Sequence, residues 1–116
     1  MSFRVGTEIE SNWEVLQEFV DNLVYKKTSY HLKDIEITVL HMSWEDFSYE
    51  QMAKASRYSA EYLNKDVGNK LWRKLTEILG EKVSKRNFKE ALKRAWRQDQ
   101  RQISPLMSTV TVFDHP

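Results

Sequence analysis

The sequence predicts an all-α fold, a small helical bundle of about five helices, on three observations. Apolar residues recur at three- and four-residue spacing over most of the chain, which is the period of an amphipathic helix. Several of these stretches start with residues that commonly cap helices. The 116 residues include four Trp, five Tyr and five Phe, enough for one core, because a chain of this size buries roughly two-thirds of its unfolded surface.

The first two helices are expected over about residues 12–27 and 33–42. Ser11 and Glu14 have the Ser-x-x-Glu spacing of a capping box, and two lysines follow at the end, where the helix dipole favours cations. The second stretch is rich in β-branched residues and is compatible with a strand, but its apolar residues also form a helical stripe, so we favour a helix. The apolar face of the first helix consists of Trp13, Leu16, Phe19, Val20, Leu23 and Val24.

A short third helix is expected after Ser48. Ser48 and Gln51 form a capping box of the Ser-x-x-Gln type, and the helix should end near Ser56. Met52 and Ala53 would then face the core.

The fourth helix is expected over about residues 60–79. Ser59 is a suitable N-cap and Gly80 a suitable stop, while Gly68 within the helix indicates a bend or close packing. Its inward stripe consists of Leu63, Val67, Leu71, Leu75, Ile78 and Leu79.

The last helix is expected over about residues 85–100, capped by Ser84, with a strongly basic outer face. From residue 105 the sequence alternates polar and apolar residues, as a half-buried strand or wing would, although no second strand is evident for it to pair with. We therefore divide the chain into a helical domain, residues 1–104, and a tail, residues 105–116, that is a wing, a partner-binding strand or disordered.

Charge is distributed unevenly along the chain. Residues 1–50 contain four Lys or Arg and ten Asp or Glu, whereas residues 51–116 contain fourteen and seven. The halves thus carry −6 and +7, although the whole chain carries +1. This asymmetry is typical of a protein whose basic half faces a polyanion, and the alternative is that helix surfaces are simply charged.

The composition argues against several classes of function. There is no Cys, and His31, His41 and His115 lack metal-ligand spacing, so we expect no metal and no cofactor. The three glycines are too scattered for a phosphate-binding loop, and no carboxylates are paired for acid–base catalysis, so we expect that the chain is not an enzyme. Without a secretory signal or an apolar run of about 20 residues, a cytoplasmic location and no membrane partner are expected.

The spacing from Ser48 to Leu75 is typical of a helix-turn-helix. A small residue, Ala53, is available where the two helices cross, and Tyr58 and Leu63 are expected to close the core around the turn. The same spacing also occurs where short capped helices meet in any three-helix bundle, so this alternative stays open.

The same region resembles known sequences. Residues 48–53, with Tyr58-Ser59 and Tyr62-Leu63, resemble the helix-turn-helix of sigma-factor region 4 and related bacterial regulators. Over about residues 14–92 the chain more closely resembles the N-terminal helix-turn-helix domain of the vWA-MoxR associated protein type. That domain usually heads larger bacterial signalling or NTP-hydrolysing proteins, so the resemblance implies a DNA-binding or adaptor role. The matching stretches are residues 19–25, 32–34, 65–72, 79–85 and 87–88.

Two positions depart from the pattern. Arg57 stands at the turn position usually held by Gly, and Ser56 stands where an apolar residue is usual. Arg57 would have to accept a left-handed conformation, at a cost of about 1–2 kcal/mol, so the turn is expected to be looser than usual.

If the unit binds DNA, the helix that begins at Ala60 should enter the major groove. Contacts to base edges are then expected from Ala60, Glu61, Tyr62, Asn64, Lys65 and Asn69. Contacts to phosphates are expected from Arg57, Ser59, Lys70, Arg73 and Lys74, because cations and helix N-termini attract anions. Non-specific attraction would come from Lys85, Arg86, Lys89, Lys93 and Arg97. Two carboxylates, Glu61 and Asp66, oppose this interpretation.

The sequence therefore predicts a DNA-binding helix-turn-helix domain, either a transcriptional regulator or the recognition head of a bacterial signalling protein. Its partner would be double-stranded DNA, and half-site geometry makes a homodimer an expectation. The alternative is a protein–protein interaction adaptor without nucleic-acid binding. Such an adaptor would dock through its acidic half, its Trp-bearing faces or the tail. The four Trp are expected to be core or interface anchors, with Trp72 the one expected to be partly exposed.

Overall fold

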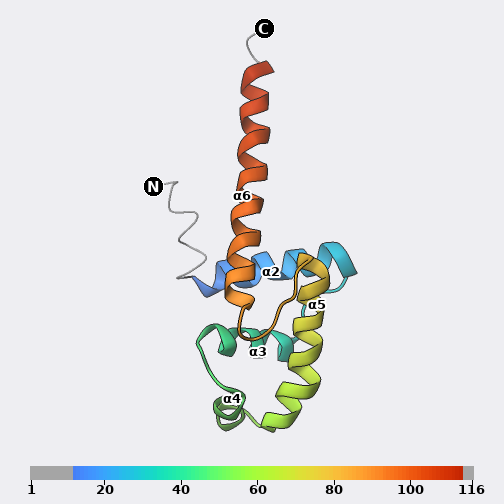
Figure 1. Ribbon diagram of the computed structural model, residues 1–116, viewed down its shortest axis with the longest axis vertical. Helices are drawn as coiled ribbons and strands as arrows, with labels where there is room; N and C mark the ends of the chain where they lie inside the picture. The colour runs from blue at the N-terminus through green and yellow to red at the C-terminus, as the bar shows by residue number, and fades with distance from the viewer. Residues whose placement is uncertain (1–11, 114–116) are drawn as a thin grey trace.

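The computed structural model describes the backbone of residues 12–113 and the side chains of residues 12–100 (Figure 1). All regular elements in this part of the chain are helical, which confirms the predicted all-α class. The π-helical segment η2 runs directly into α5, so residues 60–79 form one continuous helix, as predicted, and the described chain contains five helices. The elements are α2 (Trp13–Thr28), α3 (Asp34–Trp44), α4 (Tyr49–Ala55), η2 (Tyr62–Gly68), α5 (Asn69–Leu79) and α6 (Phe88–Phe113).

Asn12 caps the first helix, α2. Its side-chain oxygen accepts hydrogen bonds from the backbone N–H groups of Glu14 and Val15, at 3.0 and 3.3 Å. The predicted cap, Ser11, lies outside the described residues, and Asn12 already fills the capping role, for which Asn is as suitable as Ser. At the other end Ser29 takes a left-handed conformation, with φ of 67°.

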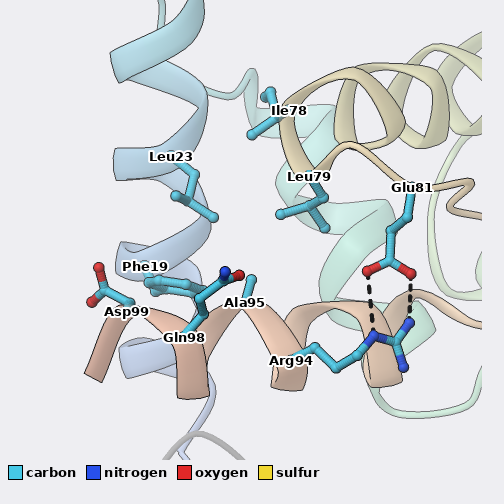
Figure 2. Close-up of a pocket in the computed structure, with 9 residues that line it drawn as sticks. All are labelled: Phe19, Leu23, Ile78, Leu79, Glu81, Arg94, Ala95, Gln98 and Asp99. Atoms are coloured by element: carbon cyan, nitrogen blue, oxygen red, sulfur yellow. Dashed lines mark hydrogen bonds and ion pairs between the residues drawn. The ribbon is translucent and has the colours of Figure 1, made fainter. Parts of the chain in front are cut away.

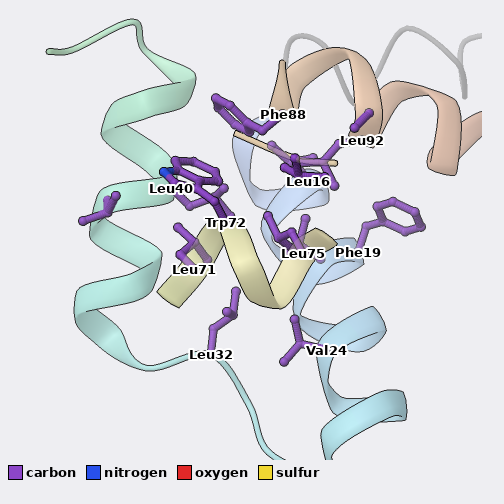
Figure 3. Close-up of a cluster of buried hydrophobic side chains, with 14 of the residues drawn as sticks. Leu16, Phe19, Val24, Leu32, Leu40, Leu71, Trp72, Leu75, Phe88 and Leu92 are labelled. Carbon is purple, nitrogen blue, oxygen red and sulfur yellow. The ribbon is translucent and has the colours of Figure 1, made fainter. Parts of the chain in front are cut away.

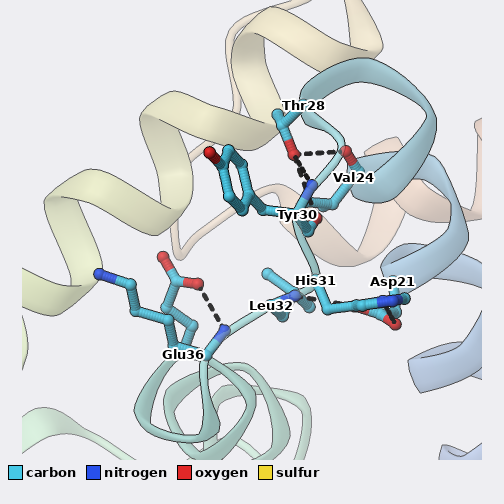
Figure 4. A network of polar contacts seen from close by, with 8 residues as sticks. Asp21, Val24, Thr28, Tyr30, His31, Leu32 and Glu36 are labelled. Carbon is cyan, nitrogen blue, oxygen red and sulfur yellow. Dashed lines mark hydrogen bonds and ion pairs between the residues drawn. The ribbon is translucent and has the colours of Figure 1, made fainter.

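Polar contacts fix the connection between α2 and α3 (Figure 4). A carboxylate oxygen of Asp21 accepts a hydrogen bond from the backbone N–H of Leu32 at 2.8 Å, and the other lies 2.7 Å from Nδ1 of His31. Thr28 donates its hydroxyl to the carbonyl of Val24 at 2.8 Å. These bonds pair polar groups that would otherwise be left free at the end of α2, so the chain turns sharply into α3.

Glu36 ties α3 to α5. Only 5% of Glu36 is exposed, and its two oxygens accept hydrogen bonds from the backbone N–H of Lys33 at 2.9 Å and from Nζ of Lys74 at 2.8 Å. The first bond caps α3, whose helical conformation confirms the preference for helix over strand at residues 33–42.

The core lies where α2, α3, α5 and α6 meet (Figure 3). Trp72 is 7% exposed and belongs to the buried core, so the prediction that it would be partly exposed was wrong. Trp72 is adjacent to Leu71 of the inward stripe, and two residues from other helices cover it: Nε1 donates to the hydroxyl of Tyr49 at 3.0 Å, and the ring centroid lies 5.0 Å from that of Phe88. The labelled core side chains are Leu16, Phe19, Val24, Leu32, Leu40, Leu71, Trp72, Leu75, Phe88 and Leu92.

The last helix, α6, differs from its prediction at both ends. Residues 85–87 form a turn, in which Ser84 accepts a hydrogen bond from the N–H of Arg86 at 3.3 Å, and α6 begins at Phe88. The backbone of α6 is helical through Pro105 to Phe113, so the predicted strand or wing was wrong. A strand without a partner leaves its N–H and C=O groups unpaired, whereas a helix pairs them internally. The boundary proposed at residue 104 falls within α6.

Candidate nucleic-acid interface

The helix-turn-helix lies at one end of the molecule. In Figure 1, α4 and the start of the helix that becomes α5 lie at the bottom of the view, while α6 leads away at the top. In the turn between the two helices, Arg57, Tyr58 and Ser59 are exposed and Ser56 is half-buried. Such a position leaves the unit accessible to a large ligand.

Side chains close to the turn define its geometry. The predicted capping box is present at α4: Ser48 accepts a hydrogen bond from the N–H of Gln51 at 3.1 Å, and Gln51 accepts one from the N–H of Ser48 at 2.8 Å. Ser59 accepts a hydrogen bond from the N–H of Tyr62 at 3.1 Å, as expected of the N-cap of the second helix.

The turn does not use the left-handed residue that the sequence suggested. Among the described non-glycine residues, positive φ occurs only at Ser29 and Asp46, so the prediction for Arg57 was wrong. Ser56 is extended, with φ of −138° and ψ of −173°, and its hydroxyl accepts a hydrogen bond from the N–H of Tyr58 at 3.2 Å. Because the extended Ser56 redirects the chain, Arg57 avoids backbone strain.

Close packing joins the two helices of the unit. Tyr49 of α4 accepts a hydrogen bond from Nε1 of Trp72 at 3.0 Å, and the hydroxyl end of its side chain lies against Gly68. Met52 and Leu63 are each 1% exposed beside this contact, while Ala53 is half-buried. Burial is also the main reason that the pKa of Tyr49 lies above its ordinary value. Gly68 thus permits the close packing that the sequence suggested.

Most of the predicted base and phosphate contacts are solvent-exposed. Only Ala60 among the residues at the start of the second helix is half-buried. The exposed predicted residues are Arg57, Ser59, Glu61, Tyr62, Asn64, Lys65, Asn69, Lys70, Arg73, Arg86 and Arg97.

Other predicted contacts are occupied by bonds within the protein. Lys74 pairs with the buried Glu36, as described above, and Lys89 lies 2.8 Å from Asp46. Lys85 lies over the ring of Tyr49, 5.6 Å from its centroid, and burial lowers its pKa. Lysines in such contacts are less available to phosphates than their positions in the sequence suggested.

Few Lys and Arg side chains of the helix-turn-helix are therefore free cations, that is, without a carboxylate within ion-pair distance. Nζ of Lys65 lies 3.8 Å from a carboxylate oxygen of Glu61, which is one helical turn earlier in the chain. In the part of the chain whose side chains are described, no carboxylate lies within ion-pair distance of Arg57, Lys70 or Arg73.

Tyr58 belongs to the exposed surface, not to the core. It is 40% exposed and stacks on Tyr62, with 5.5 Å between the ring centroids and 26° between the ring planes. The expectation that Tyr58 closes the core was wrong, whereas Leu63 does so. The polar neighbours of Tyr58, Arg57 and Ser59, are the sequence signal that could have indicated its exposure.

The Trp-bearing faces are not open surfaces either. Trp72 and Trp96 are buried, while Trp13 and Trp44 are half-buried, with Trp13 stacked on His41 at 4.3 Å between ring centroids. The large aromatic side chains that are exposed in the described residues are all tyrosines.

A groove lies at a different place, between α2, the end of α5 and α6 (Figure 2). Its volume is about 300 Å³, and Arg94 closes one side by bonding both oxygens of Glu81, at 2.6 and 3.3 Å. The hydrogen bond from Arg94 is the main reason that the pKa of Glu81 is below its ordinary value. The apolar part of the lining consists of Phe19, Leu23, Ile78, Leu79 and Ala95.

The described residues contain neither a metal site nor a membrane span. No group of three His, Cys, Asp or Glu side chains among them is placed to hold a metal ion. Likewise, no helix in this part of the chain combines the length and the apolar character needed to cross a bilayer.

The capped short helix, the exposed second helix and the tight packing between them define a helix-turn-helix domain. Residues 11–95 match the family described as the vWA-MoxR associated protein N-terminal HTH. This match covers most of the chain, which therefore belongs to that family and confirms the resemblance seen in the sequence. No curated protein and no solved structure matches the chain.

Proposed function

We propose that this helix-turn-helix binds double-stranded DNA, with its second helix in the major groove, as a transcriptional regulator or as the recognition head of a signalling protein. The observation that carries the proposal is the exposed second helix at a free end of the molecule. Arg57 before the helix and Lys70 and Arg73 along it carry positive charges that no described carboxylate neutralises. Cations placed on such a helix can contact the phosphates on either side of the groove.

The carboxylates of this surface weaken the field without cancelling it. Glu61 is matched by Lys65, whereas the exposed carboxylates Glu50, Asp66 and Glu77 have no ion pair among the described residues. They oppose four cations that are likewise exposed and unpaired there: Lys54, Arg57, Lys70 and Arg73. A modest positive field supports contacts to phosphates. Salt weakens such contacts strongly, because each contact releases a counterion.

The test is fluorescence anisotropy with a labelled random duplex at about 50 and 200 mM salt. The variant Lys70→Ala/Arg73→Ala should bind more weakly and lower the slope of log K against log salt by about 0.9 for each phosphate that it no longer neutralises. The control Lys26→Ala/Lys27→Ala makes the same charge change on exposed lysines of α2 and should bind as the wild type does. Absence of binding at 50 mM, or equal weakening in both variants, would refute the proposal.

A second candidate, a protein–protein interaction adaptor, is favoured by the groove of Figure 2. Its lining combines apolar side chains with the charged groups of Glu81, Arg94 and Asp99, as interfaces that accept an amphipathic helix do. Sedimentation of the full chain, with and without Ala95→Glu in the groove, tests the version in which a second copy is the partner. Self-association that the substitution abolishes would support it, and a monomer in both samples would reject it.

A further inference from the structure

Tyr58 and Tyr62 form a small aromatic surface at the exposed end of the helix-turn-helix. The two rings are 40% and 39% exposed and stack on each other. Neither hydroxyl group has a hydrogen-bond partner in the described part of the chain. The pair therefore contributes little to the core, and its exposure requires another explanation.

The pair is already arranged for contact with a ligand. Stacking restricts both rings before binding, so less side-chain entropy is lost when they are covered. Tyr58 follows the free cation Arg57, and Tyr62 lies in the first turn after the Ser59 cap, among the residues expected at base edges. The rings form an apolar surface that is bordered by hydrogen-bond donors and cations. Such a surface suits a ligand whose outer part is anionic and whose inner part is partly apolar.

We infer that the Tyr58–Tyr62 pair selects thymine by packing against its C5-methyl group in the major groove. The inference rests on the proposed DNA binding. The methyl group distinguishes thymine among the bases, because the other major-groove features are hydrogen-bond donors and acceptors. The stacked phenol rings match the apolar methyl group, and their free hydroxyl groups can meet the neighbouring acceptors.

Anisotropy titration of the full chain with two labelled duplexes tests this inference. One duplex has an alternating dA·dT sequence, and the other replaces each thymine by uracil, which lacks only the methyl group. The wild type should bind the thymine duplex about fourfold more tightly for each methyl group that the rings cover. Tyr58→Ala/Tyr62→Ala should bind both duplexes equally and keep the salt slope of the wild type.

Two matched variants separate this role from others. Tyr58→Phe/Tyr62→Phe keeps the rings and should retain the preference for thymine. Tyr25→Ala/Tyr30→Ala removes two exposed tyrosines, one in the last turn of α2 and one in the connection to α3, 48% and 76% exposed, and should also retain it. Circular dichroism should show that all three variants keep the helical content of the wild type.

The outcomes distinguish the inference from the proposed function. Salt-dependent binding with equal affinity for thymine and uracil would overturn the inference alone, as would disappearance of the preference in Tyr58→Phe/Tyr62→Phe. No salt-dependent binding to either duplex would overturn the proposed function and the inference together.

Discussion

Gly68→Ala should destabilise the domain, although Ala is the better helix former. Gly68 lies at the end of η2, against the side chain of Tyr49 from α4. A Cβ atom at this position would overlap the hydroxyl of Tyr49 and lie 2.9 Å from the carbonyl oxygen of Leu63, closer than real Cβ contacts. Because one of these neighbours is backbone, the helix itself must shift.

Two opposing effects set the magnitude. Ala is favoured over Gly in a helix by about 1 kcal/mol. Extra atoms in a packed interior cost about 1–3 kcal/mol, and a cost near the upper limit is expected because backbone must move. The net destabilisation should be about 1–2 kcal/mol, equivalent to a fall in Tm of roughly 5–10 °C for a domain of this size.

Urea unfolding monitored by Trp fluorescence measures the effect, and a double-mutant cycle with Tyr49→Phe identifies its cause. Tyr49→Phe alone should cost about 1 kcal/mol, because Nε1 of Trp72 loses its acceptor. When Tyr49→Phe is already present, Gly68→Ala should cost less, since the overlapping hydroxyl is gone. The reasoning is refuted if Gly68→Ala raises stability by about 1 kcal/mol, or if the two changes are additive.

Three further predictions concern stability. Lys74→Met should destabilise the domain by about 2–3 kcal/mol, less than the cost of about 3–5 kcal/mol for a fully buried pair, because Lys74 is partly exposed. A change in the free energy of unfolding below about 0.5 kcal/mol in urea would contradict this. The pKa of Glu81 is lowered in the folded protein, so its contribution is present above the ordinary carboxyl pKa and lost as pH falls through the folded pKa. Thermal melts from about pH 6 to about pH 3 should therefore show a steeper loss of Tm in the wild type than in Arg94→Met, and parallel curves would refute this. Ser48→Ala should cost about 1 kcal/mol by removing the cap of α4, measured by thermal melting, and an unchanged Tm would show that this cap is dispensable.

Helix positions in this protein follow from short stretches of sequence. Ser48 with Gln51, Ser59 before residue 60 and Gly80 after Leu79 all act where the sequence placed them. Each signal depends on residues within four positions of one another. Such local bonds form in a helix end regardless of how the bundle is assembled.

The surface was harder to predict, because exposure depends on distant neighbours. Lys74 was expected at phosphates, but Glu36, 38 positions earlier in the chain, occupies it. Trp72 was expected to be partly exposed, but Tyr49 and Phe88 cover it. Tyr58 was expected in the core, but no described element covers it fully.

The sequence by itself determined the all-α class, the helix-turn-helix and most helix ends, since capping and a regular apolar period act within one or two helical turns. Only the tertiary structure decided which cations stay free, that Gly68 admits Tyr49, and that Tyr58 and Tyr62 stack in solvent. These properties depend on which side chains from other helices come within bonding distance, and that is settled only when the whole bundle packs.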